Sequence, residues 1–168
     1  MSEIRFEHRI EGLSRLQAGP VKLQLAFRES GTELMLKALG VLQRAVALRT
    51  PVNTGQLRAS AGFSQPVVSG KSVEGRLGTN VVYALPVEFG SRPHWPPRAP
   101  IEFWVKRKLR VPAHQVRPVA FLVARKIARR GTPAKEMFRR GLEESRQQLA
   151  RIFDQLPQLV RERFTASQ

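Results

Sequence analysis

The residue types that perform catalysis in enzymes are sparse in this chain and do not form groups. The three histidines, His8, His94 and His114, have no carboxylate or second histidine at the spacing of a metal site. The sequence contains no cysteine, which excludes a thiolate ligand, a thiol nucleophile and a disulfide scaffold. A Ser/His/Asp triad stays open, because its members lie far apart in a sequence. We expect no metal, no cofactor, no catalytic residue and no enzyme activity.

One short segment, Gly70-Lys71-Ser72, matches the end of a phosphate-binding loop. It lacks the upstream glycine at the required spacing, and no clear helix follows it. The segment is typical instead of a tight turn between two strands. No nucleophile elbow occurs in the sequence.

Positive charge is the strongest chemical signal of the sequence. The 168 residues include 29 Lys and Arg against 13 Asp and Glu, which gives a net charge of +16. Such a charge favours a polyanion or an acidic protein surface as partner, and the alternative is a soluble protein with an excess of exposed arginines. We interpret the charge as spread over the whole chain. The residues that we expect to face a partner protein or DNA are Arg92, Trp95, Arg98, Arg125, Lys126, Arg129 and Arg130.

Two tryptophans lie near prolines and arginines. Trp95 is interpreted as an interface anchor, because Trp and Arg are enriched at interfaces, and stacking on bases is the alternative. Trp104 is interpreted as a core residue.

Short strands are predicted in the first half of the chain. Apolar and charged residues alternate over 4–10, which indicates a strand. Further strands are expected over 61–68, 73–77 and 80–83, as a small antiparallel meander. Pro66 places the second of these at a sheet edge or a bulge, because proline donates no ladder hydrogen bond.

Long helices are predicted around these strands. A helical period over 21–48 predicts the longest helix of the first half, and Gly31 inside it is a point where it can bend or stop. Asn53 or Thr54 is expected to cap a short helix that runs to Arg58. One helical turn over 84–89 is expected to end at Gly90.

Prolines organise the second half. Four of them over 91–100 predict an extended arm, and a helix is expected to begin at Pro100. A connection over 111–117 and a helix from Pro118 to Gly131 follow. The last stretch, 139–164, is predicted to be helical with a kink or division at Pro157. The fold class is α+β: a small antiparallel β-sheet with long helices packed against it. We expect one domain over 1–168, with a proline-rich arm and connecting helix at 91–117 and a C-terminal helix at 139–168.

No membrane segment or export signal is expected. No apolar run approaches the ~20 residues that span a bilayer. No apolar core follows the charged residues after Met1, as a signal peptide would require. The lack of cysteine fits assembly in a reducing cytoplasm.

Glu88 is the one acid between Gly75 and Ile101. In so basic a chain it is expected to pair with an arginine, and Arg58 is the candidate. We expect Tyr83, Glu88 and Phe89 to have structural roles.

Four pieces of sequence occur in an order that resembles a known family. They are Thr50-Pro51-Val52-Asn53-Thr54-Gly55-Gln56-Leu57-Arg58-Ala59-Ser60, then Gly78-Thr79-Asn80-Val81-Val82-Tyr83-Ala84, then Glu88-Phe89-Gly90, then Ile127-Ala128-Arg129-Arg130-Gly131-Thr132-Pro133-Ala134 with Phe138. This order resembles the tail-completion, or head–tail joining, proteins of long-tailed bacteriophages, which are related to minor tail protein Z. Asn53 departs from the family, which more often has Asp, but both residues cap helices.

The resemblance implies a structural virion protein of the phage neck or tail end. Such proteins form rings, often hexamers, that either join the tail tube to the head connector or terminate the tail, and DNA passes through the ring. The implied partners are other copies of the chain, the head connector or head-closure protein, the tail tube protein and passing DNA, with assembly in the host cytoplasm. The motif residues with implied structural roles are Pro51, Asn53, Thr54, Gly55, Leu57, Arg58, Ser60, Tyr83, Ala84, Glu88, Phe89, Gly90, Gly131, Thr132 and Phe138.

The alternative is a basic nucleic-acid-binding protein without catalytic activity. The cluster Arg125-Lys126-Arg129-Arg130 favours it. The sequence lacks a helix-turn-helix, zinc or RNA-binding signature, which counts against it.

Overall fold

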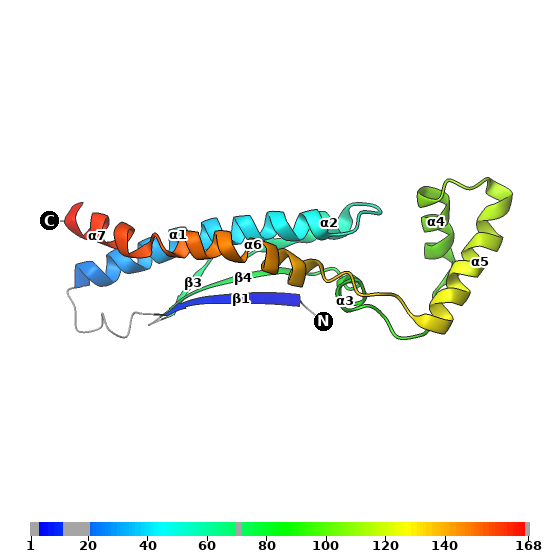
Figure 1. The fold of residues 1–168 in the computed structure, drawn as a ribbon, viewed down its shortest axis with the longest axis horizontal. Helices are drawn as coiled ribbons and strands as arrows, with labels where there is room; N and C mark the ends of the chain where they lie inside the picture. The colour runs from blue at the N-terminus through cyan, green and yellow to red at the C-terminus, as the bar shows by residue number, and fades with distance from the viewer. Residues whose placement is uncertain (1–3, 12–20, 70–71, 167–168) are drawn as a thin grey trace.

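The chain folds as an α+β protein, as predicted, in a computed structural model that describes residues 4–11, 21–69 and 72–166. Figure 1 shows an elongated layer of helices over a small sheet, with a helical hairpin at one end. The elements are β1 (Ile4–Glu11), α1 (Val21–Arg49), α2 (Gln56–Ser60), β2 (Gly62–Phe63), β3 (Val67–Ser69), β4 (Ser72–Thr79), α3 (Ala84–Phe89), α4 (Arg98–Lys108), α5 (Ala113–Arg130), α6 (Met137–Phe153) and α7 (Leu156–Ala166).

The sheet is antiparallel and is built around β4. On one side β1 pairs with β4 along its whole length, from Ile4 opposite Thr79 to Glu11 opposite Ser72. On the other side lie β2 and β3, which divide the predicted strand over 61–68 on either side of Pro66. The expected edge position of this strand is therefore confirmed. The tip of the predicted turn at 70–71 lies outside the described residues.

The predicted strand over 80–83 is wrong, and the sheet is not the expected meander. β4 continues to Thr79, whose hydroxyl oxygen accepts a hydrogen bond from the Val81 amide at 3.2 Å and turns the chain. Val82 is 85% exposed and has no strand beside it in the described part of the chain. An apolar run can resemble a strand without pairing with one. Here β1 pairs with the edge of β4 that the strand over 80–83 was expected to occupy.

The long helix α1 runs unbroken through Gly31. A Cβ atom at Gly31 would lie 3.1 Å from the Cγ2 atom of Val73, so the glycine allows α1 to approach β4 closely. The expected bend or stop at this position is therefore wrong, because the sequence cannot distinguish a glycine needed for packing from one that breaks a helix.

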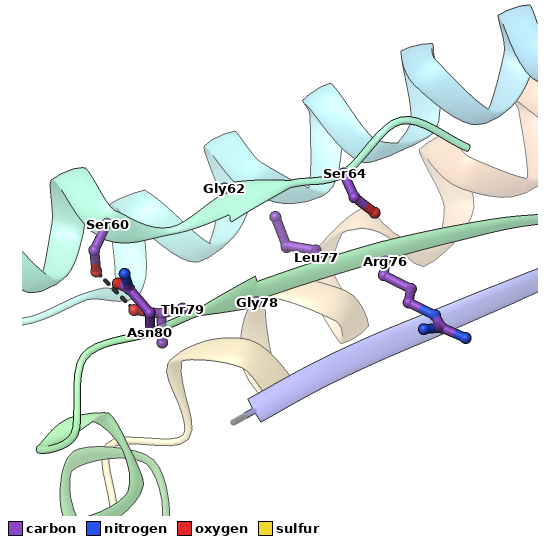
Figure 2. A pocket seen from close by; sticks show the side chains of 8 residues that line it. All are labelled: Ser60, Gly62, Ser64, Arg76, Leu77, Gly78, Thr79 and Asn80. Atoms are coloured by element: carbon purple, nitrogen blue, oxygen red, sulfur yellow. Dashed lines mark hydrogen bonds between the residues drawn. The ribbon is translucent and has the colours of Figure 1, made fainter. Parts of the chain in front are cut away.

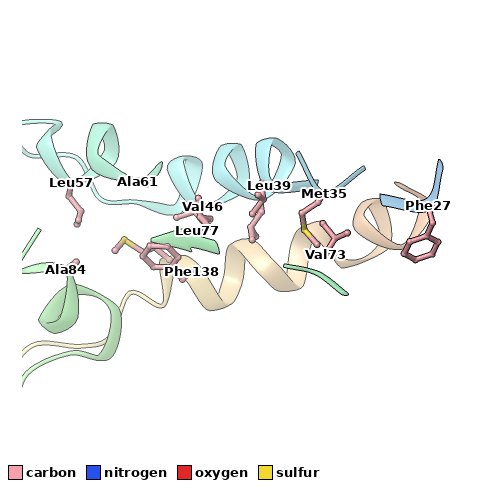
Figure 3. Close-up of a cluster of buried hydrophobic side chains, with 12 residues drawn as sticks. Phe27, Met35, Leu39, Val46, Leu57, Ala61, Val73, Leu77, Ala84 and Phe138 are labelled. Atoms are coloured by element: carbon pink, nitrogen blue, oxygen red, sulfur yellow. The ribbon is translucent and has the colours of Figure 1, made fainter. Parts of the chain in front are cut away.

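The core lies between α1, β4 and α6 (Figure 3). Phe138 at the start of α6 is fully buried and packs with Val46 of α1 and Leu77 of β4 in one cluster. The C-terminal helix divides near Pro157, as expected, into α6 and α7, and both lie along α1. Among the described residues, no helix combines the length and apolar character that crossing a bilayer requires.

The hairpin of α4 and α5 stands beside this layer (Figure 1). The helix expected at Pro100 is confirmed, although it begins at Arg98. The connection predicted over 111–117 is wrong, because α5 already begins at Ala113 with Pro112 in the cap position. Pro118 lies inside α5, where its missing N–H removes one helical hydrogen bond. Both Pro112 and Pro118 could precede the first turn of this helix, and the helix begins directly after Pro112.

Candidate interaction arm

From here on, the arm means residues 92–130, which include the hairpin of α4 and α5 and are longer than the proline-rich arm predicted from the sequence. The remaining chain is called the body. The arm holds eleven Lys or Arg residues and one acid, Glu102, whereas the body holds eighteen Lys or Arg residues and twelve acids. The interpretation that the charge is spread over the whole chain is therefore wrong. All eleven basic residues of the arm are exposed. The positive charge is concentrated on a projecting hairpin.

Two glycines form the base of the arm. Gly90 and Gly131 have positive φ angles of 77° and 68°, a conformation that L-residues with side chains rarely adopt. A Cβ atom at Gly131 would lie 1.9 Å from the backbone oxygen of Ser91, and one at Gly90 would lie 2.5 Å from that of Thr132. Both helices that precede these glycines therefore end here, as predicted, and bring the two chain segments together.

Hydrogen bonds hold the two segments at the base. The amide of Ser91 donates to the carbonyl of Thr132 at 3.0 Å, and the amide of Thr132 donates back to Ser91 at 3.1 Å. Their hydroxyl groups lie 2.9 Å apart. Just below, the amides of Lys135 and Glu136 donate to the carbonyls of Val87 and Glu88. The arm therefore leaves the body from a fixed base.

Glu88 is buried at this base and caps α6. Its two carboxylate oxygens accept hydrogen bonds from the amides of Phe138 at 3.0 Å and Arg139 at 3.2 Å. A carboxylate suits a helix N-terminus, where amides lack helical partners and the helix dipole is positive. The predicted pair with Arg58 is wrong, because no ion pair joins these two residues in the described structure and Arg58 is exposed. The sequence indicated that Glu88 needed a positive partner, and the helix end provides it.

A second acid lies at the surface of the same helix start. The guanidinium group of Arg139 hydrogen-bonds Glu136 and lowers the pKa of its carboxyl group below the ordinary value. Arg140 approaches the same carboxylate at 3.3 Å. These contacts further fix the start of α6.

Two rows on the exposed face of α5 each begin with an apolar side chain and continue with two cations. Phe121, Arg125 and Arg129 recur at four-residue spacing, and all are exposed. A parallel row is made by Leu122, Lys126 and Arg130. Residues four apart lie on the same side of a helix. The four cations predicted to face a partner thus share one surface with two apolar residues that the sequence analysis did not select.

Trp95 lies against this helix near its middle. Its ring centroid is 5.8 Å from that of Phe121, with an angle of 59° between the rings, yet Trp95 remains 54% exposed. The two rings line a cavity of about 250 Å³ with Arg98, Ala120 and Ala124. Trp95 and Arg98, both predicted to face a partner, are therefore brought together.

Trp104 faces a different crevice. It is half-buried on α4, outside the buried core cluster, so its predicted place in the core is wrong. Together with Lys108 and Lys135 it lines a crevice of about 470 Å³ between α4 and the body. The opposite wall carries the motif residues Pro51, Asn53, Thr54, Gly55, Leu57 and Tyr83.

The start of α2 in this crevice differs from the prediction. Neither Asn53 nor Thr54 occupies the cap position, since the helix begins at Gln56 after Gly55, which has a φ of 88°. The Oδ1 atom of Asn53 is buried and has no hydrogen-bond partner among the described residues. The hydroxyl group of Tyr83 donates to Gln56 at 3.4 Å and links α2 to the turn before α3.

Ser60 lies neither in the crevice nor at the arm base, but at the end of the sheet (Figure 2). Its hydroxyl group lies 2.7 Å from that of Thr79, beside an open cavity of about 400 Å³ that also exposes Arg76 and Asn80. The motif residues thus divide between this site, the crevice and the arm base, where Glu88, Gly90, Gly131, Thr132 and Phe138 meet. Ala84 is buried in the core, and Phe89 is exposed beside the arm base.

No group of three metal-ligating side chains occurs in the described part of the chain. No protein-family model matches the chain, and no curated protein or solved structure matches it.

Proposed function

We propose that this chain is a structural subunit of the neck or tail end of a tailed bacteriophage. By its family resemblance it assembles as a ring, a hexamer, that joins the tail tube to the head connector. The observation that carries the proposal is the arm, a hairpin on a fixed base whose exposed face holds large apolar side chains and exposed cations.

The exposed side chains of the arm favour a role in assembly. Trp95, Phe103, Phe121 and Leu122 are each at least half exposed. Large apolar groups that gather at a surface commonly mark an interface, and Trp and Arg are the residues that contribute most to binding there. A ring needs a contact between two different surfaces of each subunit, repeated until it closes.

The motif residues support this role through their positions. Gly90, Gly131 and Glu88 determine where the arm leaves the body and how α6 begins. Pro51, Asn53 and Gly55 face α4 across the crevice. Both groups direct the arm, and neither needs to take part in a reaction.

The test is made in a phage that carries this gene. Inactivating the gene should leave filled heads and separate tails, and purified wild-type particles should contain the chain. Image reconstruction of those particles should place several copies around the tail axis. Heads and tails that join normally without the chain would contradict the proposal, and so would a single copy on the axis.

A further inference from the structure

We propose that the outward face of α5 binds nucleic acid through its phosphate backbone, without reading the base sequence. The inference names a partner for the arm, and it rests on the proposed function in treating the arm as the part offered to other molecules. It is tested separately from that function, on the purified chain.

The spacing of the cations suits a row of phosphates. Arg125 and Arg129 lie on one row of α5, and Lys126 and Arg130 lie on the parallel row beside it. Residues four apart in a helix are separated by a rise of ~6 Å. In each strand of a duplex the phosphates recur every ~3.4 Å along the helix axis, so the two cations of one row, lying along that axis, span about two phosphate steps. Arginine adds a planar fork that binds phosphate oxygens in pairs.

Within the described residues, the cations of α5 have no ion-pair partner. In the arm, the described ion pair is Arg98 with Glu102, at 3.8 Å. Arg125, Lys126, Arg129 and Arg130 make no ion pair with a described residue and are exposed. Cations in this state are free to bind phosphates, and binding releases the counterions of the nucleic acid.

A second copy of the chain is a poor electrostatic partner. The body is itself net basic, with eighteen Lys or Arg residues against twelve acids, so it offers the arm no excess of negative charge. The partner of this face is therefore a different molecule that carries dense negative charge.

The aromatic residues favour nucleic acid over an acidic protein. Trp95, Phe121 and Arg98 line one small cavity beside the cation rows. Exposed aromatic rings next to arginine suit stacking against bases that are open at an end or in a single strand. An acidic protein surface offers carboxylates but no comparable stack of flat rings.

The experiment measures binding of the full chain to a labelled short duplex of random sequence, by fluorescence anisotropy over a series of salt concentrations. Four phosphate contacts predict a slope of log K against log salt of about −3 to −4. The arm variant carries Arg125→Gln, Lys126→Gln, Arg129→Gln and Arg130→Gln. It should bind about tenfold or more weakly at low salt, with a slope reduced in magnitude by about 3.

The matched control removes four charges from exposed positions of the body. It carries Arg44→Gln, Arg146→Gln, Arg151→Gln and Arg161→Gln, on α1, α6 and α7. Its salt slope should stay within about one unit of wild type. Urea unfolding of both variants checks that each is folded.

Three results would overturn the inference. Equal losses in the two variants would mean that net charge, and not this face, binds the duplex. Displacement of the duplex by polyglutamate as readily as by unlabelled duplex of equal charge would assign the face to an acidic protein. One sequence preferred by about 10³-fold would mean that the chain reads bases. If duplex binding fails while the chain is still found at the head–tail joint, this inference falls and the proposed function stands.

Discussion

Two phenylalanines on two helices of similar length show how body and arm differ. Phe138 on α6 is fully buried, whereas Phe121 on α5 is 51% exposed. The difference comes from what each helix packs against. α6 lies along α1 over the sheet, whereas the main neighbour of α5 is α4. An apolar helix position is therefore a core residue in one region and an exposed residue in the other.

Charge separates the two regions in the same way. The body pairs its charges across helices, as in Arg49 with Glu144 at 2.6 Å between α1 and α6, and Arg163 with Glu33 between α7 and α1. The arm has eleven basic residues and one acid, so its charges repel each other. We infer that the body is organised for its own stability and the arm for a partner.

The largest effect is expected from removing the buried ring. Phe138→Ala should lower the free energy of unfolding by about 3–5 kcal/mol, because it empties a fully buried site between α1 and β4. Phe121→Ala is the matched control in the arm and should lower the free energy of unfolding by about 1 kcal/mol or less, because its half-exposed ring loses the contact with Trp95. Urea unfolding measures both. Similar losses of unfolding free energy in the two variants would mean that the arm packs into the core together with the body.

Gly131 tests the junction between the regions. Gly131→Ala places a Cβ atom against the Ser91 carbonyl oxygen in a backbone conformation that disfavours it, and should cost about 2–3 kcal/mol. Gly40→Ala in the middle of α1 is the control, because no described atom other than the neighbouring helix backbone lies within 4 Å of its added Cβ. That variant should gain about 0.5–1 kcal/mol, since alanine favours a helix. A neutral Gly131→Ala in thermal unfolding would mean that the arm base is not fixed.

Glu88 tests the same junction from the body side. Glu88→Gln keeps the shape but replaces one accepting oxygen with an NH₂ group and removes the charge at the start of α6. The expected loss is about 1–2 kcal/mol in urea unfolding. Glu143→Gln on the exposed side of α6 is the control and should stay within about 0.5 kcal/mol. If Arg58→Met reduces the effect of Glu88→Gln in a double-mutant cycle, the two residues interact after all.

The smallest effect concerns pH and the body alone. Lys37, and after it Arg163, lower the pKa of the Glu33 carboxyl group below its ordinary value. A lowered pKa stabilises the folded state above the unfolded pKa, and this contribution is lost as the pH falls through the folded value. Wild type should therefore lose more stability than Glu33→Gln when thermal unfolding at pH 6 is compared with pH 3. Equal losses of thermal stability in the two proteins would mean that Glu33 does not contribute to the pH dependence.

The sequence predicted the fold class well because its periodic signals are local. The long helix α1, the strand β1 and the glycine stops at Gly90 and Gly131 are confirmed at nearly their predicted positions. The errors concern choices that depend on distant parts of the chain. Nothing near Val82 shows that no strand will pair with it, and nothing near Pro112 shows that it will open α5 before Pro118.

The site was predicted in part. Trp95, Arg98 and the four cations of α5 were selected by residue type, and the structure places them on one hairpin. The true partner of Glu88 was missed, because an amide at a helix start carries no sequence signal from fifty residues away. The exposed Phe121 and Leu122 were missed because apolar residues at helical spacing usually indicate a core. Counting charges by segment would have located the arm from the sequence alone.

The most direct test of this division removes the arm. Deleting residues 92–130 and joining Ser91 to Gly131 by a short glycine link spans a gap that the backbone already closes, since Ser91 and Thr132 are hydrogen-bonded to each other. If the body folds without the arm, the shortened chain should unfold cooperatively in urea with a midpoint close to that of wild type. If the arm binds nucleic acid, the shortened chain should no longer bind a random duplex. Loss of cooperative unfolding would contradict the first expectation, because the arm would then belong to the fold of the body.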